Sequence, residues 1–512
     1  MSAASTAPAG ADTWFGAHLV ASAAEVPSRV ALVFTDRSWT YAELELAIRR
    51  TVARLEKAGV RGGDRVVMQG AARPEALITL FAVTRMGAVL VPVHPQVTGG
   101  ELAVVCEETA PRAVVADEGF WEHRPAVAAD SAPSAPLRLT WDDLRPGDGP
   151  SAAVAEGLHV EPPAGSDIAV IAFTSGTSGR PKGVALTHDN LHWSMVAGLS
   201  RLPVGEDDVA LVATPLAHVA VLGGLPQCTW ARRGTVVLAP KFDAGLFIDL
   251  VRDHGVTCAF AVPAMAALLA RHPRFGDGGL NTLRWVLSGG APVQTATRAR
   301  LDERGIGVVN SFGLTETSAG VTYSALDAAG EPPTSAGRPA PGVELRVVDE
   351  AGSPAPVEAP GEIWVRGPSV ASSYWTPTGP RSTTDPDGWF HTGDRGRIDA
   401  QGRLEVVGRV KDTIITGGEN VDPAEVENAL TDLPGVVEVA VSGAPDPVWG
   451  EVVTAFLVTT DGEPSLDDLR DHLDGRLARH KWPRRLCVVP ALPRGATGKL
   501  QRARLTALLH ND

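Results

Sequence analysis

The sequence is poor in several features, and each shortage excludes a class of protein. Only four of the 512 residues are cysteines, and these lie far apart without a CxxC pair. This spacing argues against a disulfide framework or a zinc site, so we expect four reduced thiols. No stretch approaches the ~20 consecutive apolar residues that span a bilayer, so we expect no membrane-spanning helix.

Positive charge is also scarce relative to negative charge. The formal net charge is −14, and an acidic surface repels a phosphate backbone, which argues against nucleic acid as a partner. The first residues contain no basic region followed by an apolar core, so we expect no signal peptide and a cytoplasmic protein. A hydrophobic fraction of 44% and a charged fraction of 21% are typical of a globular protein.

Strand and helix patterns alternate over the first two thirds of the chain. Apolar residues at helical spacing predict helices over 38–59 and 74–87, and short apolar runs predict buried strands over 64–70 and 88–95. This alternation is typical of a parallel sheet with crossover helices. Residues 124–167 are rich in Ala, Pro and Asp, and we expect them to form a surface connection.

The pattern changes to a β-rich one after residue 338. Strands are predicted over 343–350, 361–367 and 402–410, separated by glycine and proline turns. A compact α+β segment follows, in which Pro423 marks the start of a helix over 421–435.

A chain of 512 residues is expected to hold more than one domain. The change of pattern places the boundary near 409–412. We therefore predict two domains, comprising residues 1–410 and 411–512.

The most informative segment is TSGTSGRPKGV (174–184). It lies between a strand predicted over 167–176 and a helix that begins near His188. A loop of glycines and hydroxyl residues can turn its amides and hydroxyls toward phosphate oxygens, and Lys182 adds a positive charge. The spacing is not that of a Walker loop. The segment predicts a phosphate site formed by Thr174, Ser175, Gly176, Thr177, Ser178 and Gly179.

With this loop, the chain resembles the class I adenylate-forming superfamily, which includes acyl-CoA synthetases, peptide-synthetase adenylation domains and beetle luciferases. The loop closely matches the family's signature, and further motifs follow in the family's order. These are WTYAEL (39–44), GAVLVPVHP (87–95), ATPLAHVAVLGG (213–224), VLSGGAP (286–292), NSFGLTETS (310–318), DGWFHTGD (387–394), GRVKDTIITGGENVDPAEVE (408–427) and PRGATGKLQR (493–502). The chain is most similar to the acyl-CoA synthetases.

The resemblance implies an α/β fold with a large N-terminal domain and a small mobile C-terminal α+β domain. The large domain would consist of two αβ subdomains and a β-barrel. The implied activity is ATP-dependent activation of a carboxylic acid to an acyl-adenylate with release of pyrophosphate, followed by transfer to CoA as a thioester. ATP, Mg²⁺ and CoA are the implied cofactors and cosubstrates.

The resemblance also assigns the nucleotide site. Glu316 matches the metal-binding glutamate, and Mg²⁺ there would neutralise phosphate charge. Phe312 matches the aromatic ring that stacks on adenine, and Asp394 and Arg409 match the ribose contacts. The remaining ATP/AMP-binding positions are Gly289, Gly290, Ala291, Pro292, Asn310, Ser311, Gly313 and Thr315.

Catalysis and domain movement are assigned to the second domain. Lys499 matches the catalytic lysine, whose charge would stabilise the transition state when the small domain closes. Lys411 lies at the hinge position. Rotation about it would withdraw Lys499 and bring Gly417 and Gly418 to the pantetheine channel.

The acid pocket is less well defined than the nucleotide site. His218 matches the gate position and is counted with Lys182, Glu316 and Lys499 as a catalytic residue. Its neighbours are small and apolar, and Ala217 stands where relatives often carry Phe or Tyr. No Asp that would pair with an α-amine is present in this segment, which argues against an amino acid and leaves fatty and aryl acids as alternatives.

The acceptor also has alternatives. Trp449 resembles the segment near the CoA nucleotide, but Trp482 and Ser373 depart from the family's usual basic residue and glycine. A stand-alone enzyme that loads a separate carrier protein therefore stays open, as does nitrite activation for diazotisation. A catalytically inactive nucleotide-binding protein would be expected to lack Lys182, Glu316 or Lys499, and all three are present.

Overall fold

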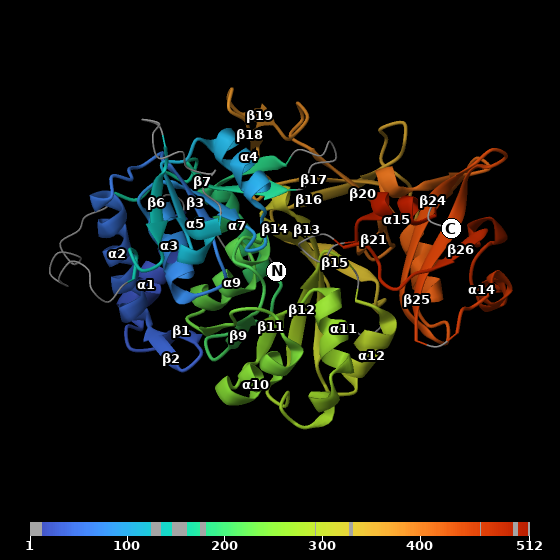
Figure 1. The fold of residues 1–512 in the computed structure, drawn as a ribbon, viewed down its shortest axis with the longest axis horizontal. Helices are drawn as coiled ribbons and strands as arrows, with labels where there is room; N and C mark the ends of the chain where they lie inside the picture. The colour runs from blue at the N-terminus through green and yellow to red at the C-terminus, as the bar shows by residue number, and fades with distance from the viewer. Residues whose placement is uncertain are drawn as a thin grey trace, which may run out of the picture.

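The fold was examined in a computed structural model of the chain. The structure describes residues 13–123, 135–145, 161–174, 181–291, 293–326, 331–460, 462–494 and 500–509. A large N-terminal domain with two extended sheets is followed by a small α+β domain (Figure 1). Figure 1 shows the small domain, in orange and red, at one end of the molecule, which agrees with the fold predicted from the motifs.

The first large sheet has eight strands. From one edge to the other these are β19 (Arg381–Ser382), β18 (Ser373–Trp375), β8 (Lys182–Thr187), β7 (Ile168–Thr174), β4 (Val89–Val93), β3 (Arg65–Gln69), β5 (Ala113–Ala116) and β6 (Leu137–Thr140). Strand β6 pairs in parallel with β5, so the expectation that 124–167 forms only a connection is wrong at these residues. The residues 124–134 and 146–160 lie outside the described structure.

The second large sheet has thirteen strands and changes character along its width. Its parallel part contains β1 (Val30–Phe34), β10 (Thr235–Leu238), β9 (Val209–Val212), β11 (Cys258–Phe260), β12 (Trp285–Gly289) and β13 (Gly307–Leu314), with β2 (Arg37–Thr40) antiparallel at the edge. Its antiparallel part contains β14 (Ala319–Tyr323), β15 (Ser335–Pro339), β21 (Leu404–Arg409), β20 (Phe390–Ile398), β17 (Gly361–Arg366) and β16 (Glu344–Val348). Within this second part, β16, β17 and β21 confirm the strands predicted over 343–350, 361–367 and 402–410, whereas β14 and most of β15 precede residue 338.

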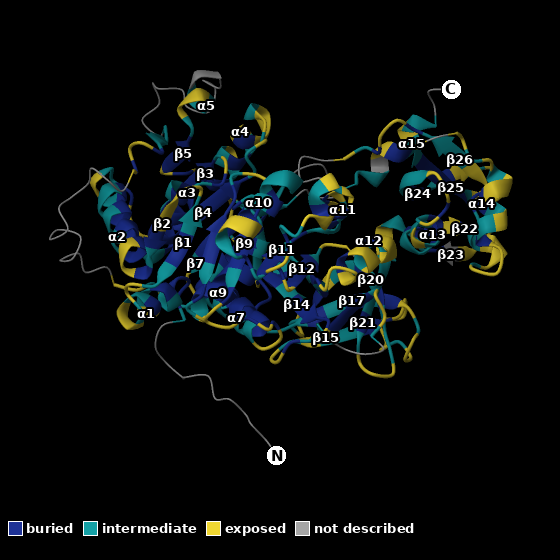
Figure 2. Cartoon of the chain, turned by 90° about the horizontal axis from the view of Figure 1, so that it is seen from below, coloured by how far each residue is buried: buried dark blue, intermediate teal, exposed yellow. Residues whose placement is uncertain are grey.

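Helices cover these sheets through separate apolar clusters. The first eight in the large domain are α1 (Ala17–Glu25), α2 (Tyr41–Lys57), α3 (Pro74–Arg85), α4 (Gly99–Thr109), α5 (Glu118–His123), α7 (His188–Leu199), α8 (Val219–Leu222) and α9 (Leu225–Ala231). The others are α10 (Ala244–His254), α11 (Pro263–Arg271) and α12 (Thr295–Asp302). One buried cluster joins α10–α12 to the parallel strands β9–β12, and a second joins α7 and α9 to β12 and β13. In Figure 2 the buried residues follow these strands through the centre of the large domain.

Local sequence explains where these helices begin. The predicted helix over 38–59 starts at Tyr41 because Thr40 caps it: the Thr40 hydroxyl accepts from the Glu43 amide, and the Glu43 carboxylate accepts from the Thr40 amide. Residues 37–40 form β2 instead. The predicted helix over 74–87 is confirmed with Pro74 at its first position.

The small domain has a five-stranded sheet with helices on both faces. Its strands are β23 (Glu419–Val421), β22 (Ile414–Thr416), β25 (Gly450–Thr459) and β24 (Val436–Asp446), with β26 (Arg485–Val488) also paired to β25. Its helices are α13 (Pro423–Leu430), α14 (Leu466–Leu473) and α15 (Leu505–Leu508), so the helix predicted over 421–435 ends five residues early. The short 3₁₀ helix η5 (Val410–Asp412) joins β21 to β22, and the boundary between residues 410 and 411 remains a prediction.

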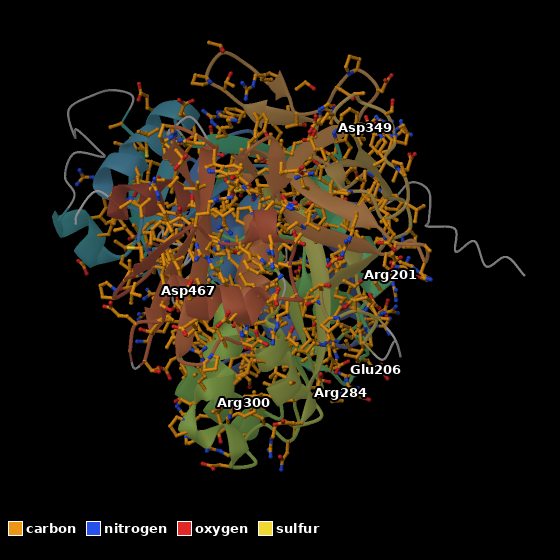
Figure 3. The ribbon with its side chains drawn as sticks, turned by 90° about the vertical axis from the view of Figure 1, so that its right-hand side faces the viewer. Arg201, Glu206, Arg284, Arg300, Asp349 and Asp467 are labelled. Atoms are coloured by element: carbon orange, nitrogen blue, oxygen red, sulfur yellow. The ribbon has the colours of Figure 1, made fainter. Side chains whose placement is uncertain are left out.

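The surface, the helix lengths and the cysteines of the described residues bear on what was expected from the sequence. In Figure 3 the labelled exposed side chains of the large domain include acidic and basic residues, and the residue labelled in the small domain, Asp467, is acidic. Within the described parts of the chain, the helices are all too short or too polar to cross a bilayer. The four cysteines form no disulfide, as expected, and two of them are buried.

One buried histidine predicts how stability depends on pH. His188 begins α7, is 0% exposed, and accepts a hydrogen bond at Nδ1 from the Phe15 amide at 2.9 Å. Burial lowers the pKa of His188 from 6.5 to about 4, although Asp167 and Asp189 oppose the shift. The unfolded chain therefore binds an extra proton between these two pKa values, so this group makes the fold less stable as pH falls through that window.

We expect His188→Asn to make the free energy of unfolding less dependent on pH between 6.5 and 4. Asparagine supplies an acceptor in place of Nδ1 but does not titrate, so the slope should fall by about 1.4 kcal/mol per pH unit at its steepest. Urea unfolding at a series of pH values measures this slope. The exposed His480→Asn variant is the control, and equal slopes in the two variants would contradict the assignment.

Candidate active site

The candidate phosphate loop joins two antiparallel strands. β7 ends at Thr174 and β8 begins at Lys182, and these two residues face each other in the register. The helix predicted to begin near His188 is confirmed as α7, but β8, which was not predicted from the sequence, lies between the loop and this helix. Residues 183–186 of β8 are buried. The predicted contacts at Ser175, Gly176, Thr177, Ser178 and Gly179 lie outside the described residues.

Lys182 and Glu316 meet at the ring of Tyr374. The Tyr374 hydroxyl donates to Oε1 of Glu316 at 3.1 Å, and Nζ of Lys182 lies 5.6 Å from the centre of the Tyr374 ring. Lys182 and Tyr374 belong to the eight-stranded sheet, whereas Glu316 lies in η4 (Thr315–Thr317), between two strands of the thirteen-stranded sheet. The two predicted charges are therefore brought together where the two large sheets meet.

Sequence reasoning did not assign a role to Tyr374. Its segment, Ser373-Tyr374-Trp375, attracted notice only as a departure from the family's usual glycine. Burial and then the neighbouring Glu316 carboxylate raise the pKa of Tyr374, so its hydroxyl stays protonated and donates. The only signal in the sequence was the rarity of tyrosine, of which there are three.

The turn after Glu316 is strained and held by its own hydrogen bonds. Ser318 has a φ of 62° and Ala319 a φ of 149°, values that residues with a Cβ rarely adopt. Thr317 accepts from the Leu314 amide at 2.8 Å and donates to the Ala319 carbonyl at 2.7 Å. Such over-determined backbone is typical of functional sites, and here it fixes the direction of the Glu316 segment.

The predicted adenine wall lies at the ends of two neighbouring parallel strands. Gly289 ends β12 and pairs with Ser311 of β13. Gly290 has a φ of 85°, and no atom lies within 4 Å of the place where its Cβ would be, so this side of the wall is open. Ala291 is exposed, and Pro292 lies outside the described residues.

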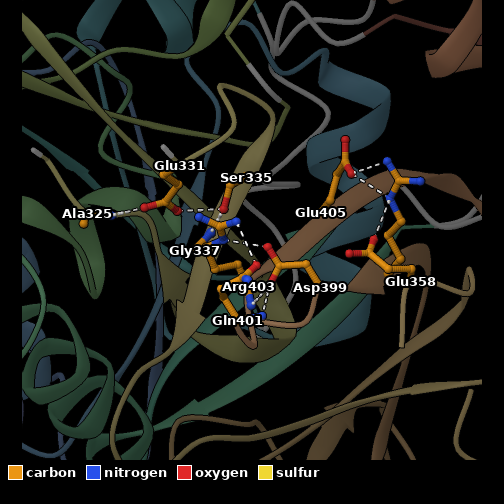
Figure 4. Close-up of polar contacts among 10 residues, drawn as sticks. Ala325, Glu331, Ser335, Gly337, Glu358, Asp399, Gln401, Arg403 and Glu405 are labelled. Carbon is orange, nitrogen blue, oxygen red and sulfur yellow. Dashed lines mark hydrogen bonds and ion pairs between the residues drawn. The ribbon is translucent and has the colours of Figure 1, made fainter. Parts of the chain in front are cut away.

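Two residues assigned to the nucleotide are engaged within the protein. Phe312 is 8% exposed and belongs to an apolar cluster with Val321 and Ile363. The side-chain amide of Asn310 donates to the carbonyls of Pro333 and Ser335, at 2.9 and 3.0 Å. Figure 4 shows the adjoining contacts through which Glu331 holds Ser335. Nucleotide contacts by Phe312 and Asn310, and by Gly313 and Thr315, therefore remain predictions.

The two residues assigned to the ribose pair with each other in the structure. Asp394 of β20 faces Arg409 of β21 in the register, and Nε of Arg409 lies 2.9 Å from Oδ1 of Asp394. Asp394 is buried while Arg409 is half-exposed, so the pair lies at the surface edge of the hairpin. Arg397 pairs with Glu405 across the same two strands, which supports this register (Figure 4).

The candidate gate has a second histidine beside it. His218 precedes α8, and its ring centre lies 6.2 Å from that of His94, which follows β4, in an edge-to-face arrangement. Burial lowers the pKa of His94. After α8, a Cβ on Gly223 would lie 2.1 Å from the Ser318 carbonyl oxygen, so only glycine fits there.

The predicted CoA segment forms a glycine hairpin on the small domain. Gly417 and Gly418 join β22 to β23, with φ values of 61° and 86°, as a two-residue turn with both φ positive requires. A Cβ on Gly417 would lie 2.6 Å from Trp449, whose carbonyl accepts from the Gly417 amide. The hairpin leaves Ile415, Val448 and Trp449 exposed.

Arg484 supplies a cation that sequence reasoning missed at this hairpin. Its guanidinium lies 4.0 Å from the centre of the Trp449 ring. The sequence draws attention instead to Trp482, but that indole is half-buried and donates to the Leu477 carbonyl at 2.9 Å. The signal was the pair Arg484-Arg485, which follows Trp482 after one proline.

The orientation of the small domain is fixed by contacts across η5. Arg395 of β20 lies 3.2 Å from Asp422, which precedes α13, and Arg271 of α11 donates to the Val437 carbonyl at 3.3 Å. Lys411 is exposed in η5, in keeping with a hinge position. Lys499 lies outside the described residues, so its catalytic role remains a prediction.

The side chains described around Glu316 suit a nucleotide whose phosphates carry a magnesium ion. They contain no group of three or more His, Cys, Asp or Glu side chains that could hold a metal by themselves. Mg²⁺ is commonly held by one or two carboxylates together with substrate phosphates, and Glu316 beside Lys182 can provide such a place. Among the described residues Glu316 forms no ion pair.

We expect Asp394→Asn to weaken AMP binding by about 10- to 100-fold, because hydrogen bonds to a charged group contribute about 1.5–3 kcal/mol. Isothermal calorimetry with AMP measures the change. Asp399→Asn is the matched control, since Asp399 pairs with Arg403 in the same hairpin without contacting Arg409. Equal affinities in the two variants would contradict the ribose assignment.

Comparisons with known proteins agree with this geometry. The AMP-binding enzyme family matches residues 19–375, and the AMP-binding enzyme C-terminal domain matches residues 425–499. The feruloyl-CoA synthase of an Amycolatopsis species is 38% identical over 475 residues, which cover 93% of this chain and 94% of that protein. The fatty acid–[acyl-carrier-protein] ligase ScoC of Streptomyces coeruleorubidus is 35% identical, with 94% and 93% covered.

A solved structure extends the similarity to the fold. O-succinylbenzoate coenzyme A synthetase from Bacillus subtilis, in complex with ATP and a magnesium ion, superimposes with a TM-score of 0.83 at 31% identity. The similarity covers 95% of this chain and 98% of that one. Because the matched regions span most of the chain, the protein belongs to the AMP-binding enzyme family.

Proposed function

We propose that this enzyme joins an aromatic carboxylic acid to CoA. Its family membership establishes the coarser activity, that of an AMP-forming acid–thiol ligase which proceeds through an acyl-adenylate. The aromatic nature of the acid, the use of CoA and the roles of individual residues are the parts that we propose.

The reaction has two steps. A carboxylate oxygen attacks the α-phosphorus of ATP, a P–O bond forms, and pyrophosphate leaves. The CoA sulfur then attacks the acyl carbon, AMP leaves, and the thiol proton is released. The first step brings two anions together, so its barrier depends on cations placed at the phosphates. Mg²⁺, when bound, supplies part of this neutralisation.

The observation that carries the proposal is the meeting of Lys182 and Glu316 at one tyrosine ring. Lys182 would contact the phosphates, and Glu316 would hold a magnesium ion that neutralises part of their charge. Asp394 and Arg409 would orient the ribose, and Lys499 would reach the carboxylate and the α-phosphate. These groups would act in adenylate formation whichever acid is the substrate.

The aromatic acid is proposed from the relatives and from the gate. Feruloyl-CoA synthase and O-succinylbenzoate coenzyme A synthetase both carry the name of an acid with an aromatic ring. At the gate, His218 and His94 offer ring faces and edges against which an aromatic acid can pack. Ala217 leaves room where relatives carry a large aromatic residue.

The test is a thioester assay with ATP, Mg²⁺ and CoA, using ferulate, benzoate or decanoate as the acid. We expect kcat/KM for the better aromatic acid to exceed that for decanoate by about 10-fold or more, the discrimination that pocket shape can provide. A higher value for decanoate would contradict the aromatic assignment. Pyrophosphate release without any thioester would instead favour chemistry such as nitrite activation.

A second candidate acceptor is a carrier protein, because ScoC is named as an acyl-carrier-protein ligase. The same assay with a phosphopantetheine-bearing acyl carrier protein in place of CoA separates the two. Faster acylation of the carrier than of CoA would favour this alternative.

Gly417→Ala tests the proposed place of the hairpin in the second step. The added methyl group would collide with Trp449 and displace the hairpin that we assign to the pantetheine channel. We expect thioester formation to fall by about 10-fold or more, and by more than acid-dependent ATP–pyrophosphate exchange, since a small misplacement can cost 100-fold.

Gly475→Ala provides the control for backbone strain. Gly475 has a similar φ of 73°, but no atom lies within 4 Å of its added Cβ. If both variants slow the thioester step equally, the contact between Gly417 and Trp449 has no part in that step.

A further inference from the structure

The three tyrosines of the chain differ in what their hydroxyls contact. The Tyr41 hydroxyl donates to the Gly234 carbonyl at 2.7 Å, and that of Tyr323 donates to the Gly320 carbonyl at 2.9 Å. The Tyr374 hydroxyl donates to a carboxylate, Oε1 of Glu316, at 3.1 Å. Tyr374 is therefore the tyrosine whose hydroxyl acts on a charged group of the active site.

We propose that Tyr374 is a positioning residue that holds the Glu316 carboxylate in the orientation that receives the magnesium ion of Mg·ATP. This inference rests on the proposed function, in which Glu316 holds that ion. It adds a residue that acts through Glu316 and does not itself contact the reacting atoms.

The segment that carries Tyr374 also holds the main chain of Glu316. The Ala371 amide donates to the Glu316 carbonyl at 2.8 Å, three residues before the tyrosine. Contacts from both the backbone and a side chain of the same segment leave Glu316 less freedom than either contact alone. Since the two segments are 58 residues apart, this arrangement depends on the fold and not on the local sequence.

The position of the tyrosine is itself fixed by the eight-stranded sheet. Tyr374 pairs with Val184 in the register of β18 and β8, two residues after Lys182. Nearby, the Asn190 side chain donates to the Val370 carbonyl at 3.1 Å, and Ser318 donates to the Ser369 carbonyl at 2.8 Å. The tyrosine is thus held at the junction of the two sheets in two ways. Hydrogen bonds hold residues 369 and 370 just before it, and its own strand β18 pairs with β8.

The faces of the ring attract cations. Nζ of Lys182 lies 5.6 Å and the guanidinium of Arg381 lies 5.2 Å from the ring centre, distances at which a cation is attracted to an aromatic face. The contact with the ring therefore stabilises the Lys182 ammonium group without an ion pair to Glu316. Among the described residues Glu316 has no ion-pair partner, which leaves its negative charge available to a metal.

A neutral hydroxyl suits this task better than a cation would. It fixes the carboxylate by a hydrogen bond without cancelling the charge that attracts Mg²⁺. Mg²⁺ demands near-ideal octahedral geometry, so a ligand that is already oriented favours its binding. Loss of such a supporting hydrogen bond typically costs 10- to 100-fold in metal affinity.

The test compares Tyr374→Phe with Tyr323→Phe, which removes a hydroxyl in β14 that donates to a backbone carbonyl. Calorimetry without any acid measures ATP binding at increasing Mg²⁺, and AMP binding without Mg²⁺. In Tyr374→Phe we expect the Mg²⁺ concentration for half-maximal ATP affinity to rise about 10-fold, at the lower end of the range for supporting residues. AMP affinity should stay within about twofold, and Tyr323→Phe should change neither quantity.

The double variant Tyr374→Phe/Glu316→Gln separates positioning from general packing. If Tyr374 acts through Glu316, it should show no further loss of Mg²⁺ dependence beyond Glu316→Gln alone. Additive losses, an equal loss of AMP affinity, or a Tyr374→Phe variant that matches Tyr323→Phe would each overturn the inference. If the affinity of the wild-type enzyme for ATP did not depend on Mg²⁺, the proposed role of Glu316 would be overturned as well.

Discussion

The contact between the two large sheets is the constraint on which the active site depends. Neither sheet contains both charges that the phosphates require: Lys182 lies on the eight-stranded sheet and Glu316 on the thirteen-stranded one. The hydrogen bond from Tyr374 to Glu316 crosses this junction. A site built in this way depends on how the sheets pack, so changes remote from the phosphates but within the junction are expected to alter its geometry.

Much of the fold could be predicted from the sequence, because local patterns indicate where strands and helices lie. The alternation of elements identified β3, α3 and β4, and the motifs singled out Asp394 and Arg409, which form an ion pair, as proposed ribose contacts. The contacts of Tyr374 and Arg484 could not be predicted, since they depend on strand register and on residues distant in the sequence. The strand β8 was missed because its apolar residues sit directly beside the glycine-rich loop and read as part of it.

The small domain combines fixed and exposed features. Arg395 and Asp422, both largely buried, hold it against the large domain, while the hairpin of Gly417 and Gly418 leaves Ile415, Val448 and Trp449 exposed. An exposed apolar surface next to the Arg484 cation suits a ligand with apolar and phosphate groups. This is the chemistry of the thiol-bearing cofactor that we propose as acceptor.

We propose that the acid is activated as an adenylate at the junction of the sheets, with Lys499 supplied by the small domain. The test is acid-dependent exchange of pyrophosphate into ATP, measured for the wild type and for Lys499→Ala. We expect exchange in the wild type that requires an aromatic acid, and a loss of about 100-fold or more in the variant, which is the effect of removing a charge that stabilises the transition state. Undiminished exchange by Lys499→Ala, or formation of ADP in place of AMP, would contradict it.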